Sequence, residues 1–448
     1  MQISDNFSYS RLIRFTIPSI FMMIVSSIYG VVDGLFVSNF LGTSAFTSLN
    51  IVFPYIIILA SFGFMLSTGG CALVAKLQGE GKPKEANEVF TMLIVVIIAI
   101  SIVFAVISCI FIKPISLWLG ATPELLEDCI TYGVCSFIAL PGFMLQTSFQ
   151  NFAIVANKPK LGMHLSLLSG MLNIVLDYVF IVVFQWGIAG AALATGVGQV
   201  VGGVIPLCYF LNKKNESTLR FVRFKWKMRA LLMSCANGSS EMLTNVSVSL
   251  VSILYNLQLM VYLGANGVSA YGVIMYVAFI FQAVFIGYTI GVSPIVSYHY
   301  GANNNQELQS LVRKSLVLVV ISSVALTLVA EVFASQFASI FVSYDPVLLE
   351  LTTKALRLYS LSYLCVGVNI FMSALFTALN NGIISAGISF LRTLVLQTAF
   401  IFIMPSLFGI DGIWLAVVVA EGLCSVVAVV LLIKNNKRYE YFASSSNR

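Results

Sequence analysis

Residues 165–183 read LSLLSGMLNIVLDYVFIVV, and this stretch decides the fold of the chain. It is apolar apart from small polar residues, Asn173 and Asp177, and it is long enough to cross a bilayer as a helix. A carboxylate inside such a span is costly, so it must pair, bind a cation or take up a proton. Because Asn173 and Asp177 are spaced i, i+4, they share one face of a helix. The stretch therefore predicts one wall of a polar site inside a membrane protein.

The composition of the whole chain agrees with this interpretation. Of its 448 residues, 59% are hydrophobic and only 9% are charged, and the mean hydropathy is +0.97. A soluble domain carries about a quarter charged residues. Apolar runs of about 20 residues, broken by Gly, Pro and charges, predict an all-α integral membrane protein rather than a barrel. The eight cysteines form no CxxC motif and there are only two histidines, so a zinc site is not supported.

The apolar runs predict twelve transmembrane helices. They fall at residues 12–39, 45–75, 90–112, 124–156, 161–184, 187–211, 230–262, 267–299, 311–341, 347–379, 384–407 and 410–433. In this arrangement every Lys and Arg except Lys113, Lys354, Arg357 and Arg392 lies on one side of the membrane. The positive-inside rule makes that side cytoplasmic and places both termini there. Arg11 and Arg14 precede the first run, which is expected to be an uncleaved span.

The chain divides into two six-span halves, residues 1–212 and 229–448, joined by a polar cytoplasmic linker at 213–228. Landmarks of the first half recur 222 residues later: Leu41-Gly42 as Leu263-Gly264, Gly69 as Gly291, Gly79 as Gly301, Glu85 as Glu307, and the GIAG of 187–190 as the GIDG of 409–412. An even number of spans gives both halves the same orientation. We therefore predict two six-helix bundles related by a pseudo-two-fold axis along the membrane normal, with the substrate between them.

This arrangement resembles the MATE family, the multidrug and toxic compound extrusion transporters. The resemblance covers essentially the whole chain and rests on the repeat and on four stretches: YGVVDGLFV at 29–37, NIVLD at 173–177, GIAGAALAT at 187–195, and GIWLA at 412–416 with Glu421. The acidic pair in the first half is most similar to the DinF-like branch. One stretch departs from the family: residues 153–159 read AIVANKP, without the arginine that many relatives carry there.

Four polar residues of the first half are expected at one depth. Asp33 lies about nine residues before Gly42, Asp177 about nine before Trp186, and Thr195 about eight after it. At 1.5 Å per residue, all lie roughly 12–14 Å below the outer surface. Their hard oxygen atoms suit Na⁺ or shared protons. The resemblance also implies that Asp33, Asn173, Asp177 and Thr195 form the cation or proton site, with Na⁺ as a possible metal ion. A purely structural polar cluster is the alternative.

Pro18 lies one half-helix below Asp33. A proline inside a helix frees a carbonyl group and can kink the helix. We hypothesise that cation or proton binding at Asp33 is coupled to bending of the first span at Pro18. A static kink is the alternative.

The second half lacks this site, because Tyr255 stands 222 residues after Asp33, and Val417 after Thr195. It carries its own polar cluster of Glu241, Arg392 and Glu421. Unpaired charges are expensive in a membrane, so Arg392 is expected to pair with Glu421 or another acid. A structural ion pair is favoured over substrate contact.

The function that follows is secondary active antiport by alternating access. The substrates are expected to be organic, cationic and amphipathic compounds, exported in exchange for Na⁺ or H⁺. No GxxxxGK[ST] motif is present, so an ion gradient is the expected driving force. A lipid-linked saccharide or lipid flippase is the alternative, although such a protein should carry several basic residues in its central spans.

The remaining expectations concern partners and location. The chain is expected not to be an enzyme and to need no cofactor beyond the coupling ion. Its expected partners are a small organic substrate and membrane lipid, with no nucleic acid, and it should be a monomer. The family resemblance implies the bacterial cytoplasmic (inner) membrane, crossed many times, with both termini cytoplasmic.

Overall fold

The computed structural model describes residues 2–212 and 214–442, without the side chains of Asn39, Thr43 and Ala265. Helices dominate this part of the chain, and it contains no β-strand. Eleven of the helices are long and apolar enough to cross a membrane, and a twelfth span is formed by two helices that meet at a bend of 46°. The predicted all-α fold with twelve spans is therefore confirmed.

The first bundle comprises the elements from α1 to α7. In order they are α1 (Tyr9–Phe36), the π-helix η1 (Val37–Leu41), α2 (Gly42–Gly79), α3 (Pro83–Ile110), α4 (Ile112–Trp118), α5 (Leu126–Val155), α6 (Pro159–Asp177), the π-helix η2 (Tyr178–Val183) and α7 (Gly187–Leu211).

The second bundle comprises the elements from α8 to α15. In order they are α8 (Met228–Gly301), α9 (Asn305–Val332), α10 (Ala334–Val342), α11 (Pro346–Ser360), α12 (Tyr363–Ala378), α13 (Gly382–Phe390), the π-helix η3 (Leu391–Leu396), α14 (Gln397–Phe408) and α15 (Ile410–Tyr439). The element α8 contains two spans, because Gly264 leaves the helical conformation at φ 63° and ψ −151°.

Two of the predicted spans are not single straight helices. The run predicted at 311–341 is divided at Phe333, where α9 ends and α10 begins one residue later. The run predicted at 347–379 consists of α11 and α12, which form the bent span. Neither break contains Pro or Gly, so hydropathy alone gave no signal for it.

The backbone itself repeats at the offset seen in the sequence. Gly42 and Gly264 both have positive φ, at 85° and 63°, and so do Gly187 and Gly409, at 61° and 58°. Each pair is 222 residues apart and occupies a turn between two spans. Glycine is required there because L side chains rarely adopt this conformation. The two halves therefore turn at equivalent places.

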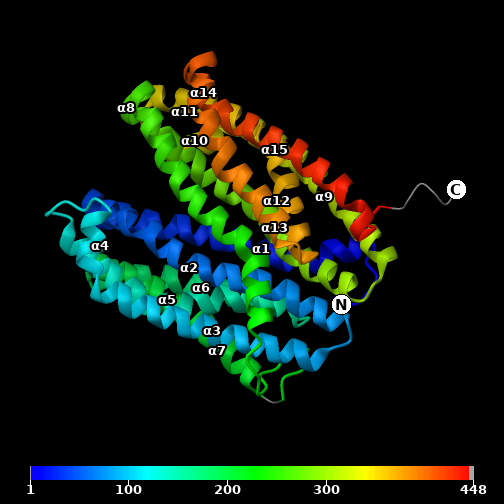
Figure 1. The fold of residues 1–448 in the computed structure, drawn as a ribbon. Coiled ribbons are helices and arrows are strands. Elements are labelled where there is room, and N and C mark those ends of the chain that lie inside the picture. Colours follow the sequence, from blue (N-terminus) through cyan, green and yellow to red (C-terminus); the bar gives the residue numbers. More distant parts are fainter. Residues whose placement is uncertain (1, 213, 443–448) are drawn as a thin grey trace.

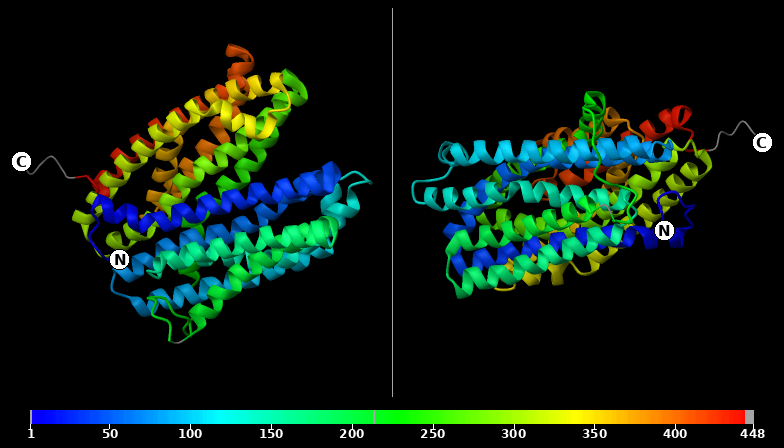
Figure 2. Two further views of the ribbon diagram at one scale, coloured as in Figure 1. Left: turned by 180° about the vertical axis from the view of Figure 1, so that it is seen from behind. Right: turned by 90° about the horizontal axis from the view of Figure 1, so that it is seen from below.

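The two bundles touch at one end and diverge toward the other (Figures 1 and 2). Both chain ends lie where the bundles touch, and we call this the terminal end of the molecule. The loops at Gly42 and Gly264 lie at the opposite end. This arrangement leaves the inter-bundle contacts concentrated toward the terminal end.

Close glycine packing joins the bundles through α2 and α8. A Cβ atom on Gly79 would overlap the carbonyl oxygen of Tyr298, and one on Gly301 would overlap that of Lys76. These two contacts exchange under the 222-residue repeat, since 79 becomes 301 and 76 becomes 298. Such reciprocal contacts are typical of a two-fold interface. The repeated glycines therefore allow the two bundles to approach each other closely.

The linker between α7 and α8 lies against the first bundle. Its Arg220 backbone N–H donates to Asn87 Oδ1 at 2.9 Å, and that of Val222 donates to Thr91 Oγ1 at 3.1 Å. Lys227 contacts the carboxylates of Glu85 and Glu88 at 3.0 and 2.9 Å. Burial alone would lower the pKa of the Lys227 ammonium, but its bonds to the two acids outweigh burial and raise that pKa.

The N-terminal segment connects both bundles at the terminal end. The Ile3 backbone N–H donates to Asn157 Oδ1 at 2.7 Å, next to α6 of the first bundle. The Phe7 backbone N–H donates to Glu307 Oε1 at 2.8 Å, at the start of α9 in the second bundle. Because Ile3 and Phe7 are also buried, the segment adds contacts that hold this end closed.

Replacing Gly79 by Ala should destabilise the contact between the bundles. The methyl group has to push α2 and α8 apart, and overpacking of this kind costs about 1–3 kcal/mol. The measurement is the thermal unfolding midpoint of the purified protein in detergent. Gly272→Ala is the matched control, because a Cβ atom there meets nothing within 4 Å. Equal midpoints for the two variants would contradict the proposed close packing.

Candidate cation site

The structure brings the four predicted polar residues of the first bundle together. Asp33 comes from α1, Asn173 and Asp177 from α6, and Thr195 from α7. Asn173 Nδ2 donates to Thr195 Oγ1 at 3.1 Å, and Thr195 Oγ1 donates to Asp33 Oδ1 at 3.2 Å. Three helices that are distant in sequence are thus connected by one chain of hydrogen bonds.

Asp177 completes the site from the end of α6. Its side chain is fully buried, and it is the last residue before the π-helix η2. Asp33 and Asp177 are close enough to interact electrostatically. The site therefore contains two neighbouring carboxyl groups, which repel each other when both are charged.

Small residues allow the three helices to approach at the site. A Cβ atom on Gly198 of α7 would lie 2.9 Å from the Ser169 carbonyl oxygen and 3.6 Å from Asn173 Cβ. Ser169 Oγ donates to the Gly198 carbonyl oxygen at 2.8 Å. On the other side of α6, a Cβ atom on Gly170 would lie 2.9 Å from the Tyr29 ring of α1. Close helix packing, as the GxxxG pair of α7 indicates, therefore positions the polar residues.

Several oxygen atoms of the site receive no hydrogen bond. Asn173 Oδ1 and both carboxyl oxygens of Asp177 are buried and have no donor among the described residues. Buried polar atoms are hydrogen-bonded in the great majority of cases, and each exception costs about 1–3 kcal/mol or more when charged. A cluster of acceptors without donors is the environment that a cation or a proton satisfies.

The donor set fits Na⁺ or H⁺ better than a transition metal. Two carboxyl groups, an amide oxygen and a hydroxyl are hard ligands of the kind that alkali cations and protons take. Within the described part of the chain, no group of three His, Cys, Asp or Glu side chains could hold a metal ion. The residues present are therefore compatible with Na⁺ as predicted, and equally with protons.

Two tyrosines next to the site were missed by the sequence reasoning. Tyr29 lies one turn before Asp33 on α1, and Tyr132 reaches the site from α5. Both are within electrostatic range of Asp33, and Tyr132 also of Asp177. The i, i+4 spacing of Tyr29 and Asp33 was a signal for the first. Nothing in the sequence indicated that α5 would bring Tyr132 to the site.

Pro18 lies inside α1, which continues through it without a break. Its neighbours face the second bundle, because a Cβ atom on Gly287 would lie 2.5 Å from Ile20 Cα, and one on Gly291 would lie 2.9 Å from Thr16 Cγ2. The proline is therefore at the contact between α1 and α8. A bend at this point would alter the packing between the bundles.

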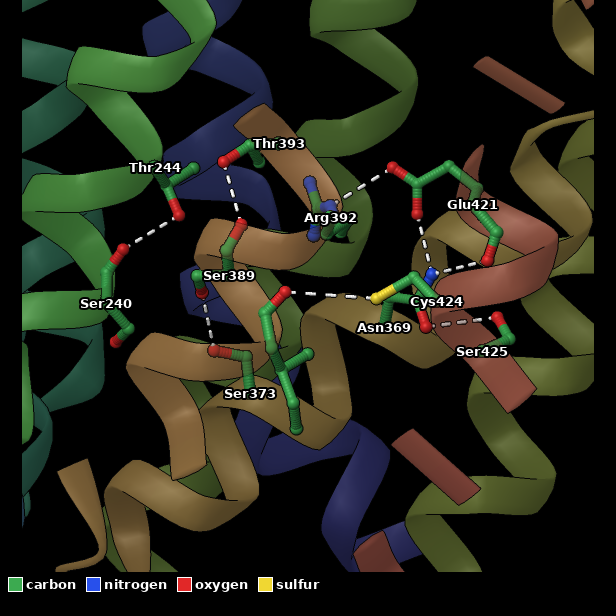
Figure 3. Close-up of polar contacts among 11 residues, drawn as sticks. Ser240, Thr244, Asn369, Ser373, Ser389, Arg392, Thr393, Glu421, Cys424 and Ser425 are labelled. Atoms are coloured by element: carbon green, nitrogen blue, oxygen red, sulfur yellow. Dashed lines mark hydrogen bonds and ion pairs between the residues drawn. The ribbon is translucent and has the colours of Figure 1, made fainter. Parts of the chain in front are cut away.

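The polar cluster of the second bundle is centred on an ion pair (Figure 3). Arg392 Nε lies 3.0 Å from Glu421 Oε1, and both side chains are buried. Asn369 Nδ2 donates to the Glu421 carbonyl oxygen at 2.9 Å and to Glu421 Oε2 at 2.7 Å. Glu241 on α8 is within electrostatic range of Arg392, although no hydrogen bond joins the two residues. The acid that pairs directly with Arg392 is thus Glu421.

The sequence profile of the MatE family matches two segments of the chain, residues 18–179 and 241–403. The chain belongs to the MatE family. One matched segment lies in each bundle, as expected for a family built on an internal repeat. MATE proteins are transporters and not enzymes, and this chain is a multi-pass membrane protein of that family.

Relatives and solved structures agree with this assignment. The chain is 24% identical over 425 residues to the multidrug export protein MepA of Staphylococcus haemolyticus, covering 95% of this chain and 93% of the relative. It is 20% identical to a multidrug resistance MATE family transporter solved in an outward-facing conformation, with a TM-score of 0.92 and 98% of each chain covered. A MATE crystal structure in a straight conformation also matches at 0.92. These likenesses establish the MATE fold.

The contrast between the two polar clusters predicts opposite effects on stability. Asp177→Asn removes a buried charge that has no donor, so it should leave the thermal unfolding midpoint in Na⁺-free buffer unchanged or raised. Glu421→Gln leaves the buried Arg392 without its ion pair and should lower the midpoint, since breaking such a pair costs about 3–5 kcal/mol. Differential scanning fluorimetry of the purified variants measures both midpoints. Equal destabilisation would show that Asp177 is a structural partner.

Proposed function

We propose that the protein is a secondary active antiporter that exports organic, cationic and amphipathic compounds in exchange for Na⁺ or H⁺. The observation that carries this proposal is the buried cluster of oxygen acceptors without donors around Asp177. A structural cluster of polar residues would be expected to satisfy its own members. The multidrug export relatives support drugs and related compounds as the substrates, and favour export over the saccharide flippase considered above.

The coupling cation acts by changing the charge of the first bundle. With both carboxyl groups ionised, Asp33 and Asp177 attract a cation from the side to which the bundles open. Binding of Na⁺ or protons neutralises them and removes the repulsion between α1 and α6. We propose that this change favours substrate release outward, and that loss of the cation to the cytoplasm resets the site.

Alternating access requires the bundles to exchange their closed and open ends. We propose that residues 1–212 and 229–448 move as two units joined by the 213–228 linker. Bending of α1 at Pro18 would connect the charge at Asp33 to the contact between α1 and α8. Full transport activity in a Pro18→Ala variant would count against this coupling.

The orientation follows from the charge distribution. The basic residues gather at the terminal end and in the linker, so we propose that this end is cytoplasmic and that the bundles diverge outward. The staphylococcal relatives support a bacterial cytoplasmic membrane. We also propose that the chain works as a monomer of the DinF-like branch, because its acidic pair lies in the first bundle.

Export of a fluorescent cationic dye from proteoliposomes tests this function. Transport is measured under an imposed Na⁺ gradient and, separately, under a pH gradient. The wild type should respond to one of the two, and Asp33→Asn should reduce the gradient-driven rate at least about tenfold because a neutral site no longer alternates in charge. Asp411→Asn is the control, since Asp411 pairs with Lys354 on the exposed surface.

Two results would contradict the proposal. Gradient-driven export at the wild-type rate by Asp33→Asn would remove the site from the coupling mechanism. Absence of export under either gradient, for every dye, would remove ion-coupled multidrug export while leaving the fold assignment intact.

A further inference from the structure

The polar cluster of the second bundle has no counterpart in the cation site. At the repeat offset, Asp33 and Thr195 are replaced by Tyr255 and Val417, while Arg392 adds a positive charge that the first site lacks. A cation is therefore the wrong ligand for this place. The question is whether Arg392 serves only to pair with Glu421.

One edge of the Arg392 guanidinium is fixed from behind. Nε faces Glu421 Oε1, Asn369 holds Glu421 through two hydrogen bonds, and Ser425 Oγ donates to Asn369 Oδ1 at 3.0 Å. Asn369 and Glu421 are 0% and 1% exposed, so this support is rigid and dry. The arginine is thus held in place by residues on α12 and α15.

The hydrogen-bonding capacity of the guanidinium is almost unused. The Nε contact with Glu421 does not have hydrogen-bond geometry, and Nη1 and Nη2 donate to no described residue. Yet only 11% of the side chain is exposed. An arginine has five N–H donors, and buried donors are nearly always satisfied. In Figure 3 the nitrogens that do not contact Glu421 point away from it.

The open edge of the guanidinium lies on the inner side of its helix. Phe390 and Val395 are exposed at 40% and 43% on the outer side of α13 and η3, whereas Arg392 is buried. The nearest further acid is Glu241 on α8, which is only partly buried. One turn earlier on α8, Gly238 packs against Met65 of the first bundle. The Arg392–Glu241 side of the cluster is therefore close to the contact between the bundles.

We propose that Arg392 and Glu241 form a subsite for zwitterionic amphipathic compounds. A substrate carboxylate would accept two parallel hydrogen bonds from Nη1 and Nη2 of Arg392, the geometry in which guanidinium and carboxylate groups bind best. Glu241 would face the protonated amine of the same molecule. This inference rests on the proposed export function and narrows its substrates to include compounds with both charges.

Competition between two matched dyes tests the subsite. Rhodamine B carries a carboxylate beside its cationic ring system, and its ethyl ester carries the cation alone. In wild-type proteoliposomes both dyes should be exported. Arg392→Gln should lower the ratio of rhodamine B export to ester export about tenfold, the usual loss when a charged hydrogen-bond donor is removed.

A second variant separates binding from folding. Arg392→Gln combined with Glu421→Gln removes both charges of the ion pair and leaves no unpaired acid, and it should show the same change in ratio. A structural role of Arg392 would lower export of both dyes equally, which would overturn the proposal. Wild-type export of the ester without rhodamine B would also overturn it, whereas export of neither dye would instead refute the proposed function.

Discussion

The structure depends on buried oxygen atoms that the protein does not satisfy itself. Asn173 Oδ1 and the two carboxyl oxygens of Asp177 have no donor among the described residues, in a core where each such atom is costly. The protein nevertheless brings Asp33 and Thr195 to the same place through close packing of α1, α6 and α7. A cost of this kind is maintained only where a ligand arrives to offset it. A small cation or a proton has the required charge and size.

The two bundles share their architecture but not their chemistry. Contacts between them exchange under the repeat, as Gly79 with Tyr298 and Gly301 with Lys76 show. The polar sites do not exchange, because the first bundle places acids where the second places Tyr255 and Val417. Symmetric contacts allow the bundles to rock against each other between equivalent states. Asymmetric sites allow one bundle to sense the ion while the other contacts the substrate.

Sequence reasoning reached the membrane fold, the span count and the four polar residues, because hydropathy and residue depth along a helix are local properties. It placed Asp33, Asp177 and Thr195 at one depth by counting residues from the turns. It did not find the break at Phe333 or the approach of Tyr132, which depend on packing between helices. The unused donors of Arg392 were equally invisible, since the orientation of a side chain in a π-helix cannot be read from spacing.

Equilibrium cation binding to the purified, substrate-free protein tests the central claim most directly. Binding of radioactive Na⁺ and proton uptake in weakly buffered solution are measured for the wild type, for Asp33→Asn combined with Asp177→Asn, and for the surface control Asp411→Asn. Our account predicts that the wild type and the control bind one of these cations and that the double variant has lost this binding. Equal binding of both cations by all three proteins would contradict it.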